Sequence, residues 1–382
     1  MKPIIKNNIV VLGSNHHNGL GIIRSLGEYG CRVSFINVTG GKSFVTKSKY
    51  LDKSWNVNNE TEVIDILLNE FQDEMNKTII LPADDYSASI IDKNINFLKA
   101  SFIFPSINNE QGNILKKMNK YEMNKFAVES GLLVPLSCKI QLNSDIKLKE
   151  VIKKLEIEYP CIVKPIQSID GAKSDITVNH TSNELEENLR KLIGCYKEVL
   201  VQEYIEKDAE IGITGLITTN SEGIIIPGII DKKRQSIVAP GSTTFARIIN
   251  EADITFDLKK VKTFLKNLGF VGIFDLEFLL KDNKIYFVEI NFRNGAYGYA
   301  FTKLGVNMPV LWCLDAIGHD ISAMPQKVKR VATFISEFAD FRNVIEREIR
   351  LLDWVKQFIS ADAYMVINKQ DIYPFFYKIY YK

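Results

Sequence analysis

The chain lacks any long hydrophobic run. Hydrophobic residues make up 46% of its 382 residues, yet no apolar stretch approaches the roughly 20 residues that a helix needs to cross a bilayer. Near the N-terminus, Lys2, Lys6 and Asn7 flank only a short apolar stretch, so the pattern of a signal peptide is missing. We therefore expect a globular protein of the cytoplasm.

Cysteine is scarce and shows no pairing pattern. The chain has five cysteines, an odd number, and they are widely separated: Cys31, Cys138, Cys161, Cys195 and Cys313. Structural zinc sites use closely spaced cysteines such as C-x-x-C pairs, and no such pair is present. Disulfide frameworks usually contain an even number of cysteines. The pattern indicates reduced thiols and argues against structural zinc.

An excess of charge of one sign is also missing. The 48 basic and 46 acidic residues leave a formal net charge of +2. Proteins that bind nucleic acid usually carry a clustered basic face. We therefore expect no nucleic-acid partner.

Two common nucleotide-binding motifs are absent. The phosphate-loop pattern G-x-x-x-x-G-K-[ST] does not occur, and Gly13 with the Gly19-x-Gly21 pair does not make the spaced G-x-G-x-x-G of a dinucleotide site. The loop between these glycines contains His16, His17 and Asn18. It could hold a substrate anion at the start of the following helix, or it could be an ordinary surface loop.

Alternating strands and helices fill the first 113 residues. The pattern predicts strands at 9–12, 32–36 and 78–81 and helices at 19–29, 60–71 and 88–98. This order is typical of a parallel, Rossmann-like α/β sheet with ligands at the carboxyl ends of its strands. Asp85 follows one such end, where it could hold a cationic group of a substrate or cap the next helix.

Two acidic hydrophobic strands form a hairpin at 274–292. Phe274, Leu276, Phe278 and Leu280 share one face of the first strand, and Tyr286, Val288, Ile290 and Phe292 share one face of the second. If both faces line one core, the loop must hold an odd number of residues, most simply Asp282 to Lys284. Glu277 then lies opposite Glu289, and Asp275 lies opposite Asn291.

Directly opposed carboxylates destabilise a sheet unless a cation lies between them. Glu277, Glu289 and Asn291 together offer the all-oxygen ligands that Mg²⁺ accepts while it keeps positions for water and phosphate, and Mn²⁺ could substitute. A solvent-facing acidic hairpin is the alternative, although such a hairpin would ordinarily interleave Lys or Thr. The pattern favours a magnesium-nucleotide site.

A lysine ends another apolar strand. In the segment 159–165, Lys164 takes the last position of a strand that looks buried, and a lysine in an apolar run needs an anionic partner. The small-residue loop 168–174 follows and could close its backbone N–H groups over phosphates. An amphipathic helix at 114–130 precedes this region, and a further apolar strand at 199–205 and a basic cluster at 231–234 come after it.

The order of these parts resembles the ATP-grasp superfamily, specifically its carboxylate-amine ligases of the predicted ATP-dependent carboligase type. The resemblance covers residues 114–310, divided into 114–200 with the small-residue loop and 201–310 with the metal hairpin. Residues 1–113 resemble the α/β domain that usually precedes the ATP-grasp domain. Residues 311–382 form a C-terminal extension. The implied fold combines α/β and α+β parts.

The resemblance implies roles for the nucleotide-binding residues. Lys120 and Lys164 match the phosphate-contacting cations, and Glu210 matches the acid that holds the ribose hydroxyls. The loop residues that would cover the phosphates are Ser168, Gly171, Ala172 and Ser174. The segment that would meet the adenine edge is Glu203, Tyr204 and Ile205. Taken singly, these lysines and acids could equally be solvated surface charges.

The resemblance also implies the residues nearest the chemistry. Arg234, with Lys233 as a less certain substitute, matches a basic residue near the γ-phosphate. Glu277, Glu289 and Asn291 match the magnesium ligands, and Arg293 matches an arginine that contacts the acyl substrate or the transferring phosphate. Asp275 is extra to the family pattern and could support these ligands or add one.

The implied activity is ATP-dependent ligation of a small carboxylate to an amine through an acyl phosphate. An amino acid or a cell-wall or surface-polymer precursor would be one substrate. The alternative is a sensor or scaffold that binds nucleotide without turnover. Carboxylation with bicarbonate is less well supported, because the short tail shows no biotin-carrier segment.

The C-terminal extension predicts one amphipathic helix at 344–358, with Ile345, Ile349, Leu352 and Val355 on one side. The last ten residues, 373–382, are aromatic and basic. They could contact a membrane surface, dock back onto the protein, or contact a second subunit in a homodimer.

Overall fold

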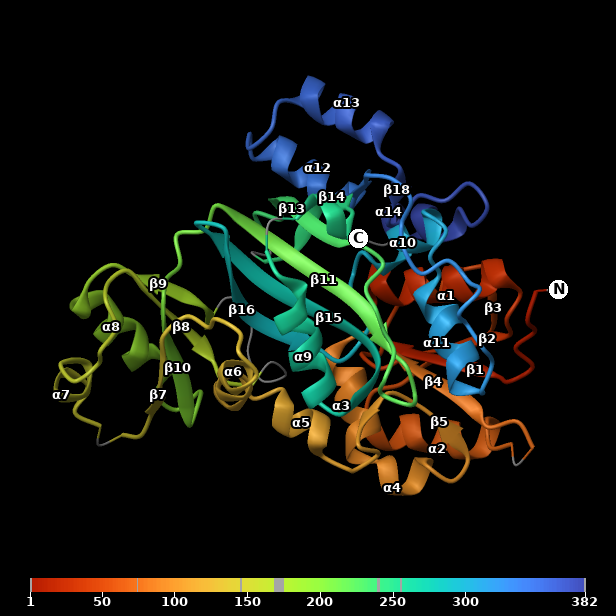
Figure 1. Ribbon diagram of the computed structural model, residues 1–382, viewed down its shortest axis with the longest axis horizontal. Helices are drawn as coiled ribbons and strands as arrows, with labels where there is room; N and C mark the ends of the chain where they lie inside the picture. The colour runs from red at the N-terminus through yellow and green to blue at the C-terminus, as the bar shows by residue number, and fades with distance from the viewer. Residues whose placement is uncertain are drawn as a thin grey trace.

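The computed structural model (Figure 1) describes residues 2–73, 75–144, 146–167, 175–238, 241–254 and 256–380. Its strands form a five-stranded, a four-stranded and a nine-stranded sheet. In Figure 1 the four-stranded sheet lies on the left, the five-stranded sheet on the right, and the long strands of the nine-stranded sheet between them. No helix in the described part of the chain is long and apolar enough to cross a bilayer.

The five-stranded sheet is parallel, as the sequence predicts. Its order is β3 (Leu51–Asn56), β2 (Val33–Asn37), β1 (Ile9–Gly13), β4 (Thr78–Pro82) and β5 (Phe102–Ile103). The three central strands, β2, β1 and β4, are completely buried because helices cover both faces of the sheet. The edge strand β3 is polar, and for this reason its sequence did not predict a strand. The helices are α1 (His17–Tyr29), α2 (Glu60–Glu70), α3 (Asp85–Lys93) and α4 (Ile95–Leu98), and a 3₁₀ turn η1 (Val45–Lys47) precedes β3.

The predicted helix at 114–130 is two helices, α5 (Asn113–Lys117) and α6 (Lys120–Glu129). Asn119 separates them, and its side chain accepts hydrogen bonds from the backbone N–H groups of Tyr121 and Glu122, both at 3.1 Å. Asn is a favoured N-cap because it satisfies these otherwise orphaned donors. The break makes Lys120 the first residue of α6.

The four-stranded sheet follows α6. Its order is β7 (Ser137–Gln141), β10 (Glu198–Glu203), β8 (Cys161–Pro165) and β9 (Thr177–Asn179). The helices α7 (Leu148–Ile152) and α8 (Ser182–Leu192) pack on it around a small apolar core. Lys164 lies near the end of β8, as predicted.

The nine-stranded sheet holds the acidic hairpin at one edge. Its strands are β16 (Lys284–Asn291), β15 (Phe270–Lys281), β11 (Ala209–Ile217), β13 (Ile229–Gln235), β14 (Thr243–Ile249), β17 (Ala332–Ile335) and β18 (Ala363–Tyr364), with β12 (Ile224–Ile225) beside β11 and β6 (Ser106–Ile107) beside β15. The 3₁₀ turn η3 (Glu251–Asp253) and helix α9 (Leu258–Asn267) connect β14 to β15. Phe264 of α9 packs with Phe274, Phe278 and Phe287 in one core.

The predicted register of the hairpin is confirmed, but its predicted loop is wrong. Glu277 pairs with Glu289 and Asp275 pairs with Asn291. The loop has two residues, Asp282 and Asn283, with φ angles of 48° and 59°. A bulge at Val288 supplies the extra residue instead, because Phe278 pairs with Phe287 while Glu277 pairs with Glu289.

The bulge also changes which side chains reach the core. Phe287, not Val288, is completely buried, and its ring centroid lies 5.9 Å from that of Phe278. Beyond the bulge, Ile290 and Phe292 remain on the core side as the alternation predicts.

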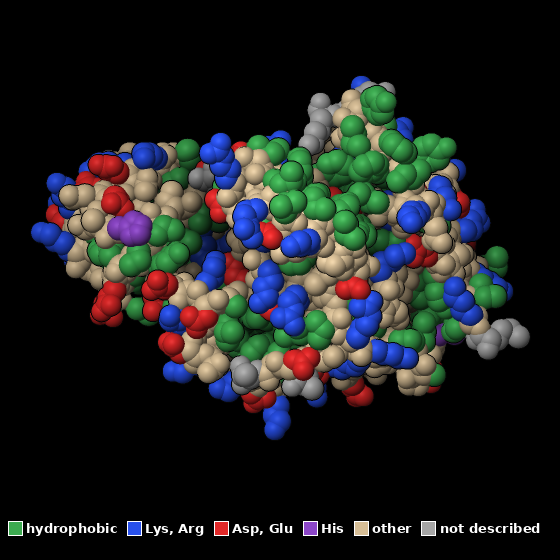
Figure 2. All heavy atoms as spheres, turned by 90° about the horizontal axis from the view of Figure 1, so that it is seen from above, with side chains coloured by type: hydrophobic (Ala, Val, Ile, Leu, Met, Phe, Trp, Pro, Cys, Tyr) green, Lys and Arg blue, Asp and Glu red, His purple; other side chains and the backbone are tan. Residues whose placement is uncertain are grey.

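The C-terminal part is built into the rest of the molecule. Helices α10 (Gly298–Lys303) and α11 (Met308–Ala316) pack against α1, and β17 and β18 extend the nine-stranded sheet. The single helix predicted at 344–358 is wrong: α12 (Glu337–Ile345) and α13 (Leu351–Ser360) are separate, with Arg347 between them at φ 64°. These two helices project at the top of Figure 1, and Figure 2, seen from that side, shows hydrophobic side chains gathered there.

The last helix, α14 (Tyr373–Tyr380), docks onto the protein. The ring of Phe375 lies 5.5 Å from Phe338, and the Lys378 ammonium lies 4.4 Å from the ring centroid of Phe44. The aromatic and basic composition of this segment is therefore used, on one face, for contacts within the chain.

Candidate functional site

The polar face of the hairpin carries the acidic residues. Phe274, Leu276 and Phe278 point into the core, so the alternation of β15 sends Asp275 and Glu277 to the other face. Asp275 and Asn291 are buried, and Glu277 and Glu289 are half-buried. The Asn291 side-chain amide donates a long hydrogen bond of 3.4 Å to the backbone carbonyl of Asp275. Four oxygen-bearing side chains thus occupy one patch of two neighbouring strands.

Lys232 of β13 faces this patch. Its Nζ lies 2.9 Å from Glu277 Oε2 and 3.7 Å from Glu210 Oε2, and its side chain is only 2% exposed. Burial alone would lower the pKa of Lys232, but Glu277 and Glu210 raise it above its usual value. Lys232 therefore carries a positive charge into the centre of the acidic patch.

A bulge in β13 separates the side chain of Lys232 from that of Arg234. Lys232 pairs with Ala246 and Arg234 pairs with Phe245, so Lys233 is the extra residue and the side chains of Lys232 and Arg234 leave opposite faces. Lys233 is exposed and pairs with Asp231 at 2.7 Å. The cation beside Glu277 is thus neither Arg234 nor Lys233, the residues that the sequence indicated.

Arg234 contacts the C-terminal helices instead. Its Nε and Nη2 donate to the two carboxylate oxygens of Asp340 at 2.8 and 2.7 Å, and Nη2 also donates to Gln357 Oε1 at 2.9 Å. The guanidinium lies 5.0 Å from the ring centroid of Phe245. These contacts commit Arg234 to α12 and α13.

The two opposed carboxylates, Glu277 and Glu289, have different pKa shifts. The pKa of Glu277 is raised, because burial and the charges of Glu289 and Asp275 outweigh the lowering effect of Lys232. For Glu289, burial acts in the same direction, but the charges of Lys120, Lys164 and Arg293 outweigh it and the pKa is lowered. The two opposed carboxylates therefore differ, and Glu289 is the one held ionised by surrounding cations.

Lys120 and Lys164 belong to the same electrostatic cluster. Burial at the end of β8 and the charge of Lys120 lower the pKa of Lys164, whereas Glu289 and Glu277 raise it, and the net result is a pKa of about 8. The backbone N–H of Lys120 donates to Ile166 O at 3.0 Å, which fixes the start of α6 against the end of β8. The two lysines predicted for phosphate binding thus act on the predicted metal ligands.

The remaining nucleotide-binding candidates lie at the end of β10 and at the start of β11. Glu210 accepts hydrogen bonds from Lys207 and Gln235, and although burial raises its pKa, Lys232 and these donors produce a net lowering. Glu203 Oε2 accepts from the backbone N–H of Leu136 at 3.1 Å. Tyr204 is exposed and Ile205 is buried. The candidates Ser168, Gly171, Ala172 and Ser174 lie outside the described residues.

Arg293 joins the hairpin to the N-terminal domain. Its Nε lies 3.2 Å from Asp85 Oδ1, and its Nη1 lies 3.3 Å from Asp275 Oδ2. Asp275 also accepts a hydrogen bond from the Tyr297 hydroxyl. Gly212 leaves room for that hydroxyl, because a Cβ there would lie 2.5 Å from it. Asp275 thus holds Arg293 and Tyr297.

The loop after β4 separates the roles of two adjacent acids. Asp84 caps α3, since its Oδ1 accepts from the Ser87 backbone N–H at 2.8 Å. Asp85 is therefore free of the capping role and contacts Arg293. Nearby, the Asn18 side chain donates to the carbonyls of Ala83 and Asn294 at 2.7 and 2.6 Å. The start of α1, which follows the N-cap His16 and includes His17, is thereby tied to the segment after the hairpin.

The donor set fits a hard divalent cation. Among the described residues no three His, Cys, Asp or Glu side chains meet as a metal-binding group. The paired strands bring together Glu277, Glu289 and the Asn291 amide, which could hold a cation. Two carboxylates and an amide suit Mg²⁺ when phosphate and water complete the shell. Burial, and after it the neighbouring carboxylates of Glu289 and Asp275, raise the pKa of Glu277, and a divalent cation would oppose this shift.

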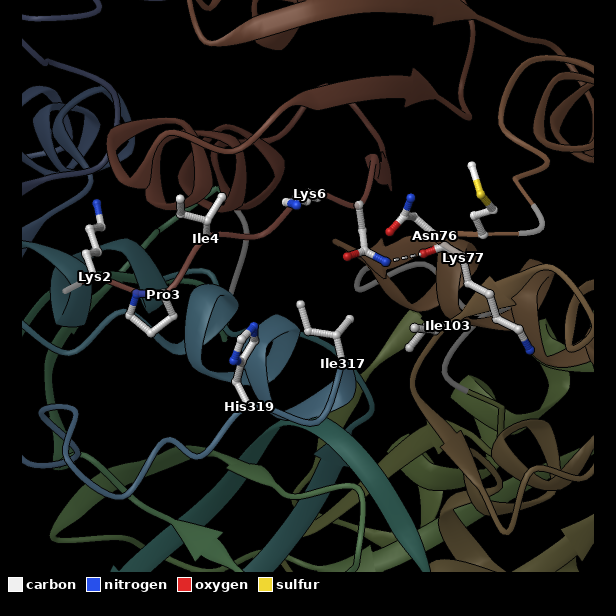
Figure 3. Close-up of a pocket in the computed structure, with 11 residues that line it drawn as sticks. Lys2, Pro3, Ile4, Lys6, Asn76, Lys77, Ile103, Ile317 and His319 are labelled. Carbon is white, nitrogen blue, oxygen red and sulfur yellow. Dashed lines mark hydrogen bonds between the residues drawn. The ribbon is translucent and has the colours of Figure 1, made fainter.

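A cavity of about 750 Å³ lies away from this cluster, beside the N-terminal segment (Figure 3). Lys2, Lys6, Lys77 and His319 line it together with apolar residues, and none of the acidic-site residues does. Lys2 donates to the carbonyl of Tyr29 at 2.9 Å, and Lys77 donates to that of Lys99 at 3.3 Å. Two of its lysines are thus engaged with backbone, and we assign it no function.

Residues 125–303 match the family model of the ATP-grasp domain. Among curated proteins, the formate-dependent phosphoribosylglycinamide formyltransferase of Sulfurisphaera tokodaii is 27% identical over 183 residues, 46% of this chain and 45% of that protein. The D-alanine–D-alanine ligase of Petrotoga mobilis is 34% identical over 142 residues, 35% of this chain and 46% of that protein. The chain spans about half the length of these curated relatives.

Two solved structures share the fold over most of their length. The L-amino acid ligase from Bacillus licheniformis aligns with a TM-score of 0.64 and 16% identity, covering 87% of this chain and 80% of that one. The N5-carboxyaminoimidazole synthetase from Staphylococcus aureus, complexed with ADP, aligns with a TM-score of 0.70 and 15% identity, covering 93% and 87%. At these identities the likeness concerns the fold.

Proposed function

The chain belongs to the ATP-grasp superfamily through its domain at residues 125–303, and from this premise we propose that it is an ATP-dependent carboxylate-amine ligase. The observation that carries the proposal is the meeting of Glu277 and Glu289 with Lys232, Lys164 and Lys120. Opposed, half-buried carboxylates surrounded by lysines are poorly suited to a passive surface but well suited to a metal-bound polyphosphate.

The proposal gives each group of site residues a role in binding magnesium or ATP. Glu277, Glu289 and Asn291 hold Mg²⁺, and Lys120 and Lys164 contact the phosphates of ATP together with the loop 168–174. Glu203, Tyr204 and Ile205 meet the adenine, and Glu210 meets the ribose. Lys232 takes the place near the transferring phosphate that the sequence indicated for Arg234. When bound, Mg²⁺ supplies positive charge that neutralises the phosphate oxygens.

The proposed reaction has two steps. A carboxylate oxygen of the acyl substrate attacks the γ-phosphorus of ATP, the bond to the β-phosphate oxygen breaks, and ADP leaves. An amine then attacks the acyl carbon and the amide bond forms. Inorganic phosphate leaves with the electrons of the broken carbon–oxygen bond and takes up the proton that the nitrogen loses. The protein contributes positioning and charge neutralisation and needs no nucleophile of its own.

In this proposal Arg293 contacts the acyl substrate. Asp85 and Asp275 hold its guanidinium at the boundary between the N-terminal domain and the hairpin. A guanidinium fixed in this way can present its remaining donors to a carboxylate. Within the proposal the substrates are a small carboxylate and an amine, one of them an amino acid or a cell-wall or surface-polymer precursor.

The proposal is tested by measuring ADP and phosphate release across a matrix of carboxylates and amines, with the product identified by mass. We expect release to require one carboxylate and one amine together, with a product mass equal to their sum minus water. Tight binding of ATP with no turnover for any pair would contradict the ligase and support a nucleotide sensor.

A further inference from the structure

Three of the last four residues of β13 contact different parts of the molecule. Lys232 contacts Glu277 at 2.9 Å, Arg234 contacts Asp340 at 2.8 and 2.7 Å, and Gln235 donates to Glu210. The bulge at Lys233 makes this division, because without an extra residue Lys232 and Arg234 would share one face. The contact between Arg234 and Asp340 therefore helps to determine where Lys232 and Gln235 point.

Arg234 and Asp340 form a buried, bidentate ion pair. The Asp340 side chain has no exposed surface and the Arg234 side chain is 16% exposed, and the pair is bidentate. Bidentate arginine–carboxylate pairs fix geometry as well as charge, because two parallel hydrogen bonds define the plane of the guanidinium. Gln357 of α13 accepts a third hydrogen bond from the same guanidinium at 2.9 Å.

A second residue of α12 holds the same strand end. The buried Asn343 side chain donates to the Gln235 carbonyl at 2.8 Å and to Thr244 Oγ1 at 3.3 Å, and it accepts from the Ile237 backbone N–H at 3.2 Å. These bonds satisfy backbone groups that the irregular ladder between β13 and β14 leaves open. Helix α12 thus replaces the missing ladder contacts where β13 ends.

From these contacts we propose that Asp340 and Asn343 are positioning residues for nucleotide binding. They act through Arg234 and the end of β13, and they orient Lys232 toward Glu277 and Gln235 toward Glu210. The α12–α13 hairpin is then a working part of the ATP site, although it comes after the matched domain in the chain. The inference rests on the proposed function, because Lys232 and Glu210 are taken to contact ATP.

The test is the binding of ATP with Mg²⁺ to Asp340→Asn, measured by calorimetry, together with KM and kcat wherever turnover is found. Asparagine keeps the shape but loses the charge that fixes Arg234. We expect ATP to bind about tenfold more weakly, with KM for ATP rising more than kcat falls. The matched control is Asp52→Asn, which removes an exposed pair between Asp52 of β3 and Arg32; we expect unchanged ATP binding.

A purely structural role would lower the melting temperature of Asp340→Asn but leave ATP binding by the folded protein unchanged, and that result would overturn the inference. If Asp340→Asn does not fold, Gln357→Ala replaces it, since it removes one hydrogen bond to Arg234 and is expected to weaken ATP binding about threefold. Wild-type binding by Gln357→Ala would then count against the inference. Failure of the wild-type protein to bind ATP would instead contradict the proposed function.

Discussion

Lys232 and Lys233 are neighbours in sequence but have different surroundings. Lys232 is buried against Glu277, whereas Lys233 is exposed and pairs with Asp231. We predict that Lys232→Met lowers the rate of ATP turnover by about 10² or more, as the loss of a charge-stabilising donor commonly does, and that Lys233→Met changes it less than about twofold. The measurement is ADP release under identical conditions, and equal losses in both variants would contradict the assignment.

The choice among these cations could not be made from the sequence. Residues 232–234 are three basic side chains in a row, and an alternating pattern assigns faces only when the ladder is regular. The bulge at Lys233 depends on pairing with β14, which is a tertiary feature. The burial of Lys164 was predictable, because its apolar neighbours mark a buried strand. A charge in such a strand needs an anionic partner.

Asp85 and Asp84 offer a second comparison between adjacent residues. Asp85 holds Arg293, whereas Asp84 caps α3. We predict that Asp85→Asn raises KM for the carboxylate substrate about tenfold without changing KM for ATP, because Arg293 loses one of its two anchors. In contrast, Asp84→Ala should lower the free energy of unfolding by about 1 kcal/mol. Steady-state kinetics and urea unfolding check both, and an effect of Asp85→Asn confined to ATP would refute this role.

The turn of the hairpin is a separate structural element from the acidic face. Asp282 and Asn283 both have positive φ, a conformation that costs most residues about 1 to 2 kcal/mol but costs glycine little. We predict that Asn283→Ala lowers the free energy of unfolding by about 1 kcal/mol, while Asn283→Gly keeps or raises it. Urea unfolding of the two variants makes the comparison, and the prediction fails if alanine is tolerated as well as glycine.

The hairpin shows which part of an element the sequence specifies. The alternation of hydrophobic residues predicted the pairing of Glu277 with Glu289, because both strands must turn their apolar faces to one core. It could not say whether the odd residue lies in the loop or in a bulge, because both satisfy the same parity. The structure places it at Val288, and Phe287 replaces Val288 in the core.

The whole molecule is tied together by a buried ion pair between the first helix and the C-terminal part. Arg24 Nε lies 2.9 Å from Asp371 Oδ2, and neither side chain has exposed surface. We predict that Arg24→Met lowers the free energy of unfolding by about 3 to 5 kcal/mol, because it leaves a buried carboxylate without its charge partner. The matched change Arg32→Met, which breaks an exposed pair with Asp52, should cost less than about 1 kcal/mol. Similar losses in denaturant unfolding would show that the buried pair has no special role.

At this scale the sequence predicted the parts better than their connections. The parallel sheet, the strand lysine and the acidic hairpin follow from local patterns. The contacts of Arg24 with Asp371 and of Arg234 with Asp340 join residues more than one hundred positions apart, and no local pattern encodes them. The aromatic tail was compatible with several partners, and the packing of Phe375 and Lys378 favours docking within the chain.

The central claim is that the polar face of the hairpin binds ATP through a divalent cation. Calorimetric titration of ATP into the wild-type protein and Glu289→Gln, each with excess Mg²⁺ and again with a chelator, tests it most directly. We predict that Mg²⁺ strengthens ATP binding to the wild-type protein by at least about tenfold and that Glu289→Gln loses most of this dependence. The same magnesium dependence in both proteins would contradict the claim.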